Sequence, residues 1–194
     1  NYEERGQYAV LLKPRTDSRD GERKIQSRMG LSASAEYVDE FLKEISTIWK
    51  KENTEYRYQG KKVDAVLVDE AQFLSEAEID TLSDLVDFYN IPVICYGLRT
   101  DFRNRLFPGS RRLMEIADVI EEVPTVCWCG KRAQCNTRYA NGEIVREGAQ
   151  IMLGSNESYV ALCRKHYKEG KLWKEAGAEN ETSTRRNCKI MEKE

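Results

Sequence analysis

Two neighbouring acids follow a short apolar run in the sequence VLVDEAQF, residues 66–73. An apolar run of this kind is typical of a buried strand in a parallel sheet, and such sheets bind ligands beyond the carboxyl ends of their strands. Asp69 is then placed to hold Mg²⁺, while Glu70 is free to take a proton from an attacking hydroxyl or water. The pattern therefore indicates phosphoryl transfer. The alternative is a pair of acids that opens a surface loop.

A second pair of charged residues follows the first predicted strand, in the sequence KPRTDSR. Because the carboxyl ends of parallel strands meet at one edge, we expect Asp17 and Arg19 on the same rim as Glu70. An arginine there would stabilise the charge that spreads over the oxygens of a moving phosphoryl group. A solvated surface position is the alternative for Arg19.

The phosphate-binding pattern G-x-x-x-x-G-K-[ST] does not occur in the given residues. The opening residues 1–7 read as the end of a helix, with Gly6 at the C-cap, followed at once by a strand. We therefore expect residues that carry the missing loop and its strand to precede Asn1.

Cysteines cluster in the third quarter of the chain. Because no secretion signal is visible, metal binding by these cysteines is favoured over disulfides. Cys127 and Cys129 form one pair, and Cys163 with His166 forms the other. Three thiolates and one imidazole make a closed tetrahedral shell for a structural Zn²⁺. The first pair is tighter than the common CxxC spacing, so Cys135 is kept as a substitute ligand. The alternative is a set of buried free thiols and an unrelated histidine.

Apolar strands that alternate with amphipathic helices predict an α/β fold with a mostly parallel sheet and helices on its faces. Ser34 is a candidate N-cap for the first helix, and Ser75 with Glu78 fits a capping box. Residues 16–28 read as a polar loop. The expected strands are 8–14, 64–70, 91–98 and 119–123. The expected helices are 34–52, 75–90 and 110–118.

The organisation predicted from these elements is a nucleotide-binding α/β domain over 1–124, a small β-rich zinc domain over 125–170 and a charged tail over 171–194. The apolar runs are too short to cross a membrane, and no signal peptide is visible, which favours a cytoplasmic protein. A net charge of −2 gives no support to non-specific nucleic-acid binding.

With these residues in hand, the chain resembles the type II, zinc-containing thymidine kinases in their bacterial form. The motifs that carry the resemblance occur in order and reach to about Lys168. They are KPRTDSRDG, SRMGL, VLVDEAQFL, PVICYGLRTDFR, LFPGS and LGSNESYVALCRKHY. The resemblance implies a P-loop-type parallel sheet with helices on both faces, plus a zinc-binding lasso domain.

The resemblance also implies transfer of the γ-phosphoryl group of ATP to the 5′-hydroxyl of thymidine, with Mg²⁺, to give dTMP. By matching position, Glu70 is the general base and Asp69 supports the Mg²⁺. Asp17 and Arg19 match an acidic and basic pair near the phosphates. The family forms homotetramers and is inhibited by dTTP, its end-product triphosphate.

A nucleoside pocket follows from the same resemblance. Its walls around the deoxyribose and base match Phe73, Leu98, Phe102 and Phe107. The zinc-pinned insert matches a lasso that folds over the thymine, with Met152, Gly154 and Tyr159 in that segment. Recognition of a base by backbone groups penalises wrong bases through missing hydrogen bonds.

Two other function classes remain open on the residues alone. An ATP-dependent nucleic-acid motor fragment with a zinc ribbon is one, because DEAQ-like strings also occur in helicase ATPases. It predicts a basic groove and further helicase motifs, which the sequence does not contain. A non-catalytic zinc-bearing interaction domain is the other, and it would tolerate Glu70→Gln without consequence.

Overall fold

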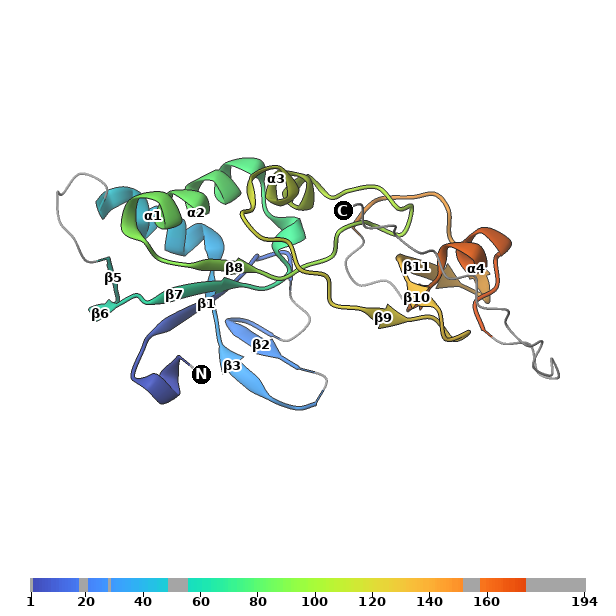
Figure 1. Cartoon of the computed structure of the whole chain (residues 1–194), viewed down its shortest axis with the longest axis horizontal. Helices are drawn as coiled ribbons and strands as arrows, with labels where there is room; N and C mark the ends of the chain where they lie inside the picture. The colour runs from blue at the N-terminus through green and yellow to red at the C-terminus, as the bar shows by residue number, and fades with distance from the viewer. Residues whose placement is uncertain (1, 18–20, 28, 49–55, 152–157, 174–194) are drawn as a thin grey trace, which may run out of the picture.

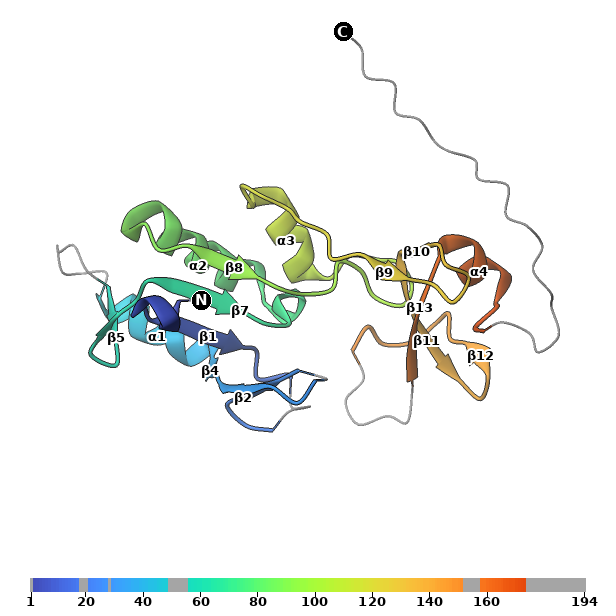
Figure 2. The same ribbon diagram turned by 60° about the horizontal axis from the view of Figure 1, so that its bottom comes forward.

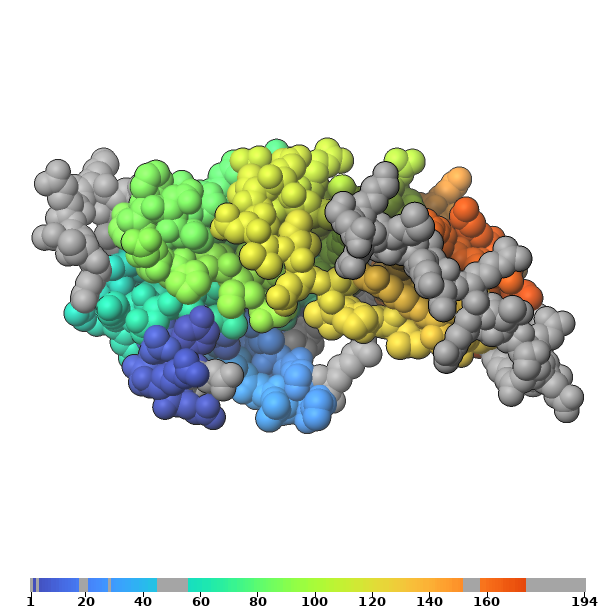
Figure 3. All heavy atoms as spheres, viewed as in Figure 1, coloured from blue at the N-terminus to red at the C-terminus, as the bar shows by residue number. Residues whose placement is uncertain are grey.

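The computed structural model describes residues 2–17, 21–27, 29–48, 56–151 and 158–173. These residues form two bodies that lie end to end, an α/β body and a smaller β-rich body (Figure 1). The space-filling view shows the same elongated outline, with the two bodies in contact (Figure 3).

The α/β body is built on a central parallel sheet, whose described strands run in the order β4-β1-β7-β8. Leu12 of β1 pairs with Val68 of β7 on one side and with Glu36 of β4 on the other. The predicted strands near 8–14, 64–70 and 91–98 are therefore confirmed. The strands are β1 (Ala9–Lys13), β4 (Glu36–Tyr37), β7 (Ala65–Val68) and β8 (Val93–Cys95).

Three helices lie along one side of this sheet and bury its core (Figure 1). On that side, Val10, Leu12 and Val66 are buried with apolar residues of the helices in one cluster. Leu11 and Leu67 alternate to the other side and are only half-buried, so among the described residues the expected second helical layer is not observed. The helices are α1 (Val38–Ile48), α2 (Glu76–Tyr89) and α3 (Pro108–Ile116).

The start of α2 follows the predicted capping box. The Ser75 side chain accepts a hydrogen bond from the backbone N–H of Glu78, and the Glu78 carboxylate accepts one from the backbone N–H of Ser75. Two of the unpaired N–H groups at the helix start are satisfied in this way. The last turn ends at Asn90, which adopts the left-handed conformation of a C-cap.

The predicted start of the first helix at Ser34 is wrong. Residues 36–37 pair with β1 as strand β4, and α1 begins only at Val38. Part of the predicted loop 16–28 is also a strand, because β2 (Lys24–Gln26) pairs with β3 (Ser32–Ser34) in a hairpin. Backbone pairing with a neighbouring strand therefore overrides the local helical pattern and the polar composition here.

The predicted strand 119–123 is also wrong, because these residues form no strand. Val119 is 74% exposed and Val123 is 81% exposed. A strand needs a partner for its backbone groups, and within the described part of the chain none pairs with this segment or with the outer edge of β8. At the start of the chain, a short 3-10 turn η1 (Glu3–Arg5) precedes Gly6, whose φ of 70° fits the predicted helix end.

The β-rich body has its own buried cluster and an antiparallel sheet in the order β12-β11-β13. Asn141 and Gly142 both adopt positive φ and make the tight turn between β11 and β12. Its elements are β9 (Thr125–Val126), β10 (Arg132–Ala133), β11 (Cys135–Ala140), β12 (Glu143–Ile144), β13 (Ser158–Leu162) and α4 (Arg164–Glu169). Figure 2 shows β11, β12 and β13 side by side.

A short hairpin of β5 (Arg57–Tyr58) and β6 (Lys61–Lys62) precedes β7. Over the described residues, the helices are all too short or too polar to span a bilayer.

Candidate functional site

The two acids of the DEAQ stretch lie at the carboxyl end of β7, where the sheet stops. The backbone N–H of Asp69 donates to the carbonyl of Leu12 at 2.9 Å, which ties this end to β1. Glu70 then turns the chain with a φ of 50°, in the left-handed region that is unusual for a glutamate. The Asp69 carboxylate accepts the backbone N–H of Glu70 at 2.9 Å and supports the turn. Both acids are half-buried, so the predicted rim position holds.

Gln72 holds the Glu70 side chain, and the sequence reasoning missed it. This residue lies in the 3-10 turn η2 (Ala71–Phe73) and is 1% exposed. Its amide nitrogen donates to the Glu70 carboxylate, and its amide oxygen accepts the backbone N–H of Leu98 at 3.0 Å. The only sequence signal for it is a polar residue between the apolar neighbours Ala71 and Phe73.

Three of the predicted nucleoside-wall residues gather around this turn. The rings of Phe73 and Phe107 pack edge to face with centroids 5.7 Å apart. The Ser110 hydroxyl donates to the Leu98 carbonyl at 2.6 Å. Gly109 permits this close packing, because a Cβ there would lie 2.7 Å from the carbonyl oxygens of Ala71 and Leu74. The start of α3 therefore packs directly on η2.

The other two described wall residues, Phe102 and Tyr159, meet through Arg138. The Arg138 guanidinium is fully buried, lies 3.9 Å from the centre of the Phe102 ring and donates to the Tyr159 hydroxyl at 2.8 Å. The same group donates to the carbonyl of Ala149 at 3.1 Å. The Tyr167 hydroxyl donates to the Phe102 carbonyl at 2.9 Å. The loop after β8 is thus fixed to the β-rich body.

A buried carboxylate completes this junction. Asp101 is 1% exposed and accepts the side-chain amide of Gln150 at 3.1 Å. Burial raises the pKa of Asp101, but hydrogen bonds from the backbone N–H groups of Arg105 and Arg103, the Arg103 side chain and Gln150 more than offset this and lower the pKa overall. The charged carboxylate is therefore the form that the fold stabilises.

Asp17 also lies beyond the end of β1, but it faces inward. Its carboxylate lies 3.5 Å from the Lys13 ammonium, and both side chains are almost fully buried. Lys13 donates in addition to the carbonyl of Lys24 at 2.9 Å. The structure therefore places Asp17 in an internal ion pair below the rim. Arg19, Met152 and Gly154 lie outside the described residues.

The predicted metal ligands converge in the β-rich body. Ligand atoms of Cys127, Cys129, Cys163 and His166 all lie within 4.8 Å of one another. The sulfur of Cys127 is 3.4 Å from Nδ1 of His166, and the sulfurs of Cys129 and Cys163 are 4.0 Å apart. Cys135, the substitute ligand, is not in this group. The arrangement can hold a metal ion with three sulfurs and one nitrogen.

Local structure explains how these ligands are positioned. Cys127 and Cys129 sit in a tight turn after β9, closed by a hydrogen bond from the Gly130 N–H to the Cys127 carbonyl at 2.8 Å. Cys163 is the N-cap of α4, and His166 lies in its first turn. The Trp128 ring stacks on the His166 ring at 4.1 Å and fixes the imidazole plane. The cluster therefore joins the β9 turn to α4.

The thiol chemistry of the cluster is uneven. Burial raises the pKa of Cys127, but hydrogen bonds with the backbone of Cys129 and Cys163 and with His166 lower it overall to about 6. Burial raises the pKa of Cys135. A thiolate is the form that binds a metal, so the hydrogen bonds around Cys127 favour the ligand state.

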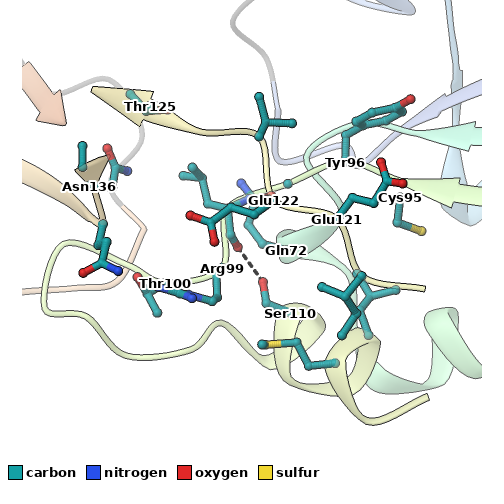
Figure 4. Close-up of a pocket in the computed structure, with 18 of the residues that line it drawn as sticks. Gln72, Cys95, Tyr96, Arg99, Thr100, Ser110, Glu121, Glu122, Thr125 and Asn136 are labelled. Carbon is teal, nitrogen blue, oxygen red and sulfur yellow. Dashed lines mark hydrogen bonds between the residues drawn. The ribbon is translucent and has the colours of Figure 1, made fainter. Parts of the chain in front are cut away.

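A pocket of about 420 Å³ opens between the two bodies, next to this site (Figure 4). Gln72, Arg99 and Ser110 line it from the α/β side, and Thr125 and Asn136 line it from the β-rich side. Of the predicted wall residues, the pocket includes Leu98 alone among those that the structure describes, and Glu70 is not part of its lining. Gln72 is the residue that connects the pocket to the acid.

Comparisons with known proteins identify the family. The family model described as thymidine kinase matches residues 1–167. A thymidine kinase of Haemophilus influenzae is 46% identical over 170 residues, which cover 87% of this chain and 85% of that protein. One from Legionella pneumophila is 44% identical over 175 residues, covering 90% and 81%. One from Idiomarina loihiensis is 43% identical over 170 residues, covering 87% and 85%. With a match of this extent, the chain belongs to the thymidine kinase family.

Proposed function

We propose that this protein transfers the γ-phosphoryl group of ATP to the 5′-hydroxyl of thymidine and yields dTMP, with Glu70 as the general base. Membership of the family supports the activity. The observation that carries the assignment of Glu70 is its position: a half-buried carboxylate at the carboxyl end of β7, beside Phe73 and opposite Leu98 through Gln72. A base must lie within hydrogen-bond reach of the proton that it takes, and this rim is where substrates of parallel sheets bind.

The residues at the rim also fit a magnesium ion. Mg²⁺ prefers oxygen ligands and is commonly held through one or two carboxylates and the phosphates of the nucleotide. Asp69 would hold it, and the ion would neutralise charge on the phosphates of ATP. We assign Arg19 to the same phosphates. The contact of Asp17 with Lys13 supports a positioning role for Asp17 at the base of that rim.

The nucleoside would lie between aromatic and aliphatic side chains. Phe73 and Phe107 form one edge-to-face pair near Glu70. Phe102 and Tyr159 are held together by Arg138 across the junction of the two bodies. Flat rings such as these add affinity for any base, so selectivity for thymine would come from backbone groups near Met152 and Gly154.

The cysteine and histidine cluster fits a structural zinc ion. With zinc bonds of about 2.3 Å to sulfur, the ligand atoms of a tetrahedral site lie roughly 3.8 Å apart. The ligand atoms here lie within 4.8 Å of one another, so little rearrangement is needed. Zinc would hold the β9 turn against α4 and so stabilise the body that carries Tyr159. The ligand set of three cysteines and one histidine has no open position for water.

The wider organisation of the enzyme is proposed on the same basis. Residues 1–124 form the nucleotide-binding domain with a P-loop-type sheet, 125–170 form the zinc-binding lasso domain, and 171–194 form a tail. The active form is a homotetramer, and dTTP, the end-product triphosphate, inhibits it.

The test is Glu70→Gln in the full-length protein. The substitution keeps size and hydrogen bonding but removes the base, so we expect kcat for thymidine phosphorylation to fall about 10³-fold while thymidine still binds. Thymidine affinity is measured by calorimetry, and turnover by the formation of dTMP. Undiminished turnover would reject the role of Glu70, whereas a parent protein that forms no dTMP would favour a non-catalytic interaction domain.

A further inference from the structure

We propose that Gln72 is a positioning residue that aims the Glu70 carboxylate and fixes it relative to Leu98. The inference rests on the proposed role of Glu70 as the base. It adds a requirement that the family match does not contain. The Gln72 amide must hold the Glu70 carboxylate at one end and must itself be held by the backbone of Leu98 at the other.

The hydrogen bonds of Gln72 define the direction of its amide. The backbone N–H of Leu98 is a donor, so it requires the amide oxygen, which it meets at 3.0 Å. The Glu70 carboxylate is an acceptor when ionised, so it requires the amide nitrogen, which donates to it. In a flipped amide, the NH₂ group would face the Leu98 N–H, which is also a donor. The amide oxygen would face the Glu70 carboxylate, which is also an acceptor. Gln72 is therefore locked in one orientation by partners on both sides.

Packing confines the same side chain. Gln72 is 1% exposed, so water does not compete for its amide. A Cβ at Gly97 would lie 2.4 Å from its amide oxygen, which means that only glycine leaves room for the amide at this place. The backbone N–H of Ala71 donates to the carbonyl of Tyr96 at 2.9 Å and holds η2 against the loop after β8 at a second point. The amide cannot move without one of these contacts breaking.

These contacts matter because of the geometry of Glu70. Its backbone lies in the left-handed region, and its carboxylate accepts a hydrogen bond from the Gln72 amide. A base displaced by about 1 Å loses on the order of 10²-fold in rate. The link through Gln72 sets the distance between the base and the wall at Leu98, so the amide would govern the chemical step more than substrate binding.

Gln72→Glu removes one of the two hydrogen bonds of the amide and leaves the other possible. The new carboxylate keeps an acceptor for the Leu98 N–H but loses the donor to Glu70 and sets two carboxylates against each other. We expect kcat to fall about 100-fold while the KM for thymidine stays within about threefold. The matched control is Gln7→Glu, the same chemical change at an exposed residue before β1, and it should leave both constants unchanged.

The experiment measures kcat, KM and thymidine affinity for Gln72→Glu, Gln7→Glu and Glu70→Gln in the full-length protein. If Glu70→Gln is inactive while Gln72→Glu keeps the parental kcat, the positioning role is overturned and the proposed function stands. If Glu70→Gln is fully active, Glu70 is not the base, and the positioning role of Gln72 fails with it; if the parent protein forms no dTMP, the proposed function itself fails. A rise in KM at unchanged kcat would also overturn the role, because it would show that Gln72 serves substrate binding alone.

Gly97→Ala gives a second route if Gln72→Glu does not fold. Gly97 has no positive φ, so alanine fits its backbone, and the new methyl group would displace the Gln72 amide. We expect the same pattern, a lower kcat with little change in KM. When both variants fold, the kcat of the double variant Gln72→Glu with Gly97→Ala should lie within about threefold of the lower kcat of the two single variants. Independent, multiplying losses would contradict a shared action through the amide.

Discussion

The guanidinium of Arg138 lies 3.9 Å from the centre of the Phe102 ring, although Arg138 belongs to β11 of the β-rich body and Phe102 to the loop after β8. The same guanidinium donates to the Tyr159 hydroxyl at 2.8 Å. One buried side chain therefore holds two residues that we assign to the nucleoside wall. The relative position of the two bodies and the arrangement of these two proposed wall residues depend on the same contacts.

This relationship predicts that Arg138→Lys is not conservative. Lysine keeps the charge but loses the planar fork that stacks on Phe102 and donates to several partners. A desolvated cation–π contact and buried charged hydrogen bonds together give an expected loss of about 2–4 kcal/mol in the free energy of unfolding. We also expect the KM for thymidine to rise about tenfold or more, because a misplaced wall loses on the order of 1–3 kcal/mol of binding.

Urea unfolding and steady-state kinetics check this expectation. The matched control is Arg132→Lys in β10, where the arginine is exposed and pairs with Glu122 at the surface. Exposed ion pairs contribute about 0–1 kcal/mol, so the control should lose little stability. Equal losses for the two variants would show that the stacking on Phe102 has no special weight.

The metal cluster gives a prediction that separates the two candidate ligand sets. Purified protein should contain about one zinc ion per chain, as expected for a closed structural site. Cys129→Ser should reduce the zinc content by at least about tenfold, because three ligands hold the ion far less tightly. Cys135→Ala should leave the zinc content unchanged, since Cys135 lies outside the group of converging ligands.

Elemental analysis measures the zinc content, and a chelator tests what the metal stabilises. Removal of zinc should change the fluorescence of Trp128, which stacks on His166, and should expose the β-rich body to proteolysis. Protein without zinc, or zinc loss in Cys135→Ala alone, would refute the proposed ligand set.

The sequence could predict the features that depend on local patterns. The Ser75 and Glu78 box, the apolar strand before Asp69 and the paired spacing of Cys163 with His166 each need only neighbours within a few residues. The prediction of a strand over 119–123 is wrong because a strand requires a partner strand, which the described residues do not provide. The predicted helix start at Ser34 is wrong for the opposite reason. Residues 32–34 and 36–37 pair with neighbouring strands as β3 and β4, and a helical pattern does not reveal those partners.

Gln72 and Arg138 show why the site was only partly predictable. Each acts through contacts with residues far away in the chain, and neither has a spacing that marks its role. Gln72 meets Leu98 across 26 positions, and Arg138 meets Tyr159 across 21. A buried amide or guanidinium must satisfy its donors, but the sequence does not name the partner. The structure supplies that information through distances and burial.

Cys95 at the end of β8 gives the last prediction, which concerns pH. Burial raises the pKa of its thiol to about 11 from an ordinary value of 9.0. The neutral thiol is the form that the fold favours, so between these values the unfolded chain has lost the proton while the folded chain still holds it. The stabilisation is complete below pH 9 and falls as the pH rises toward 11, by about 2–3 kcal/mol in total. Cys95→Ala should remove this contribution, so the difference in free energy of unfolding between the parent and the variant should shrink across that range.

Urea unfolding at pH 8, 9.5 and 11 measures this difference, with Cys135→Ala as a control for a second buried thiol whose pKa is also raised. A difference that stays constant with pH would show that the Cys95 thiol titrates alike in the folded and unfolded states.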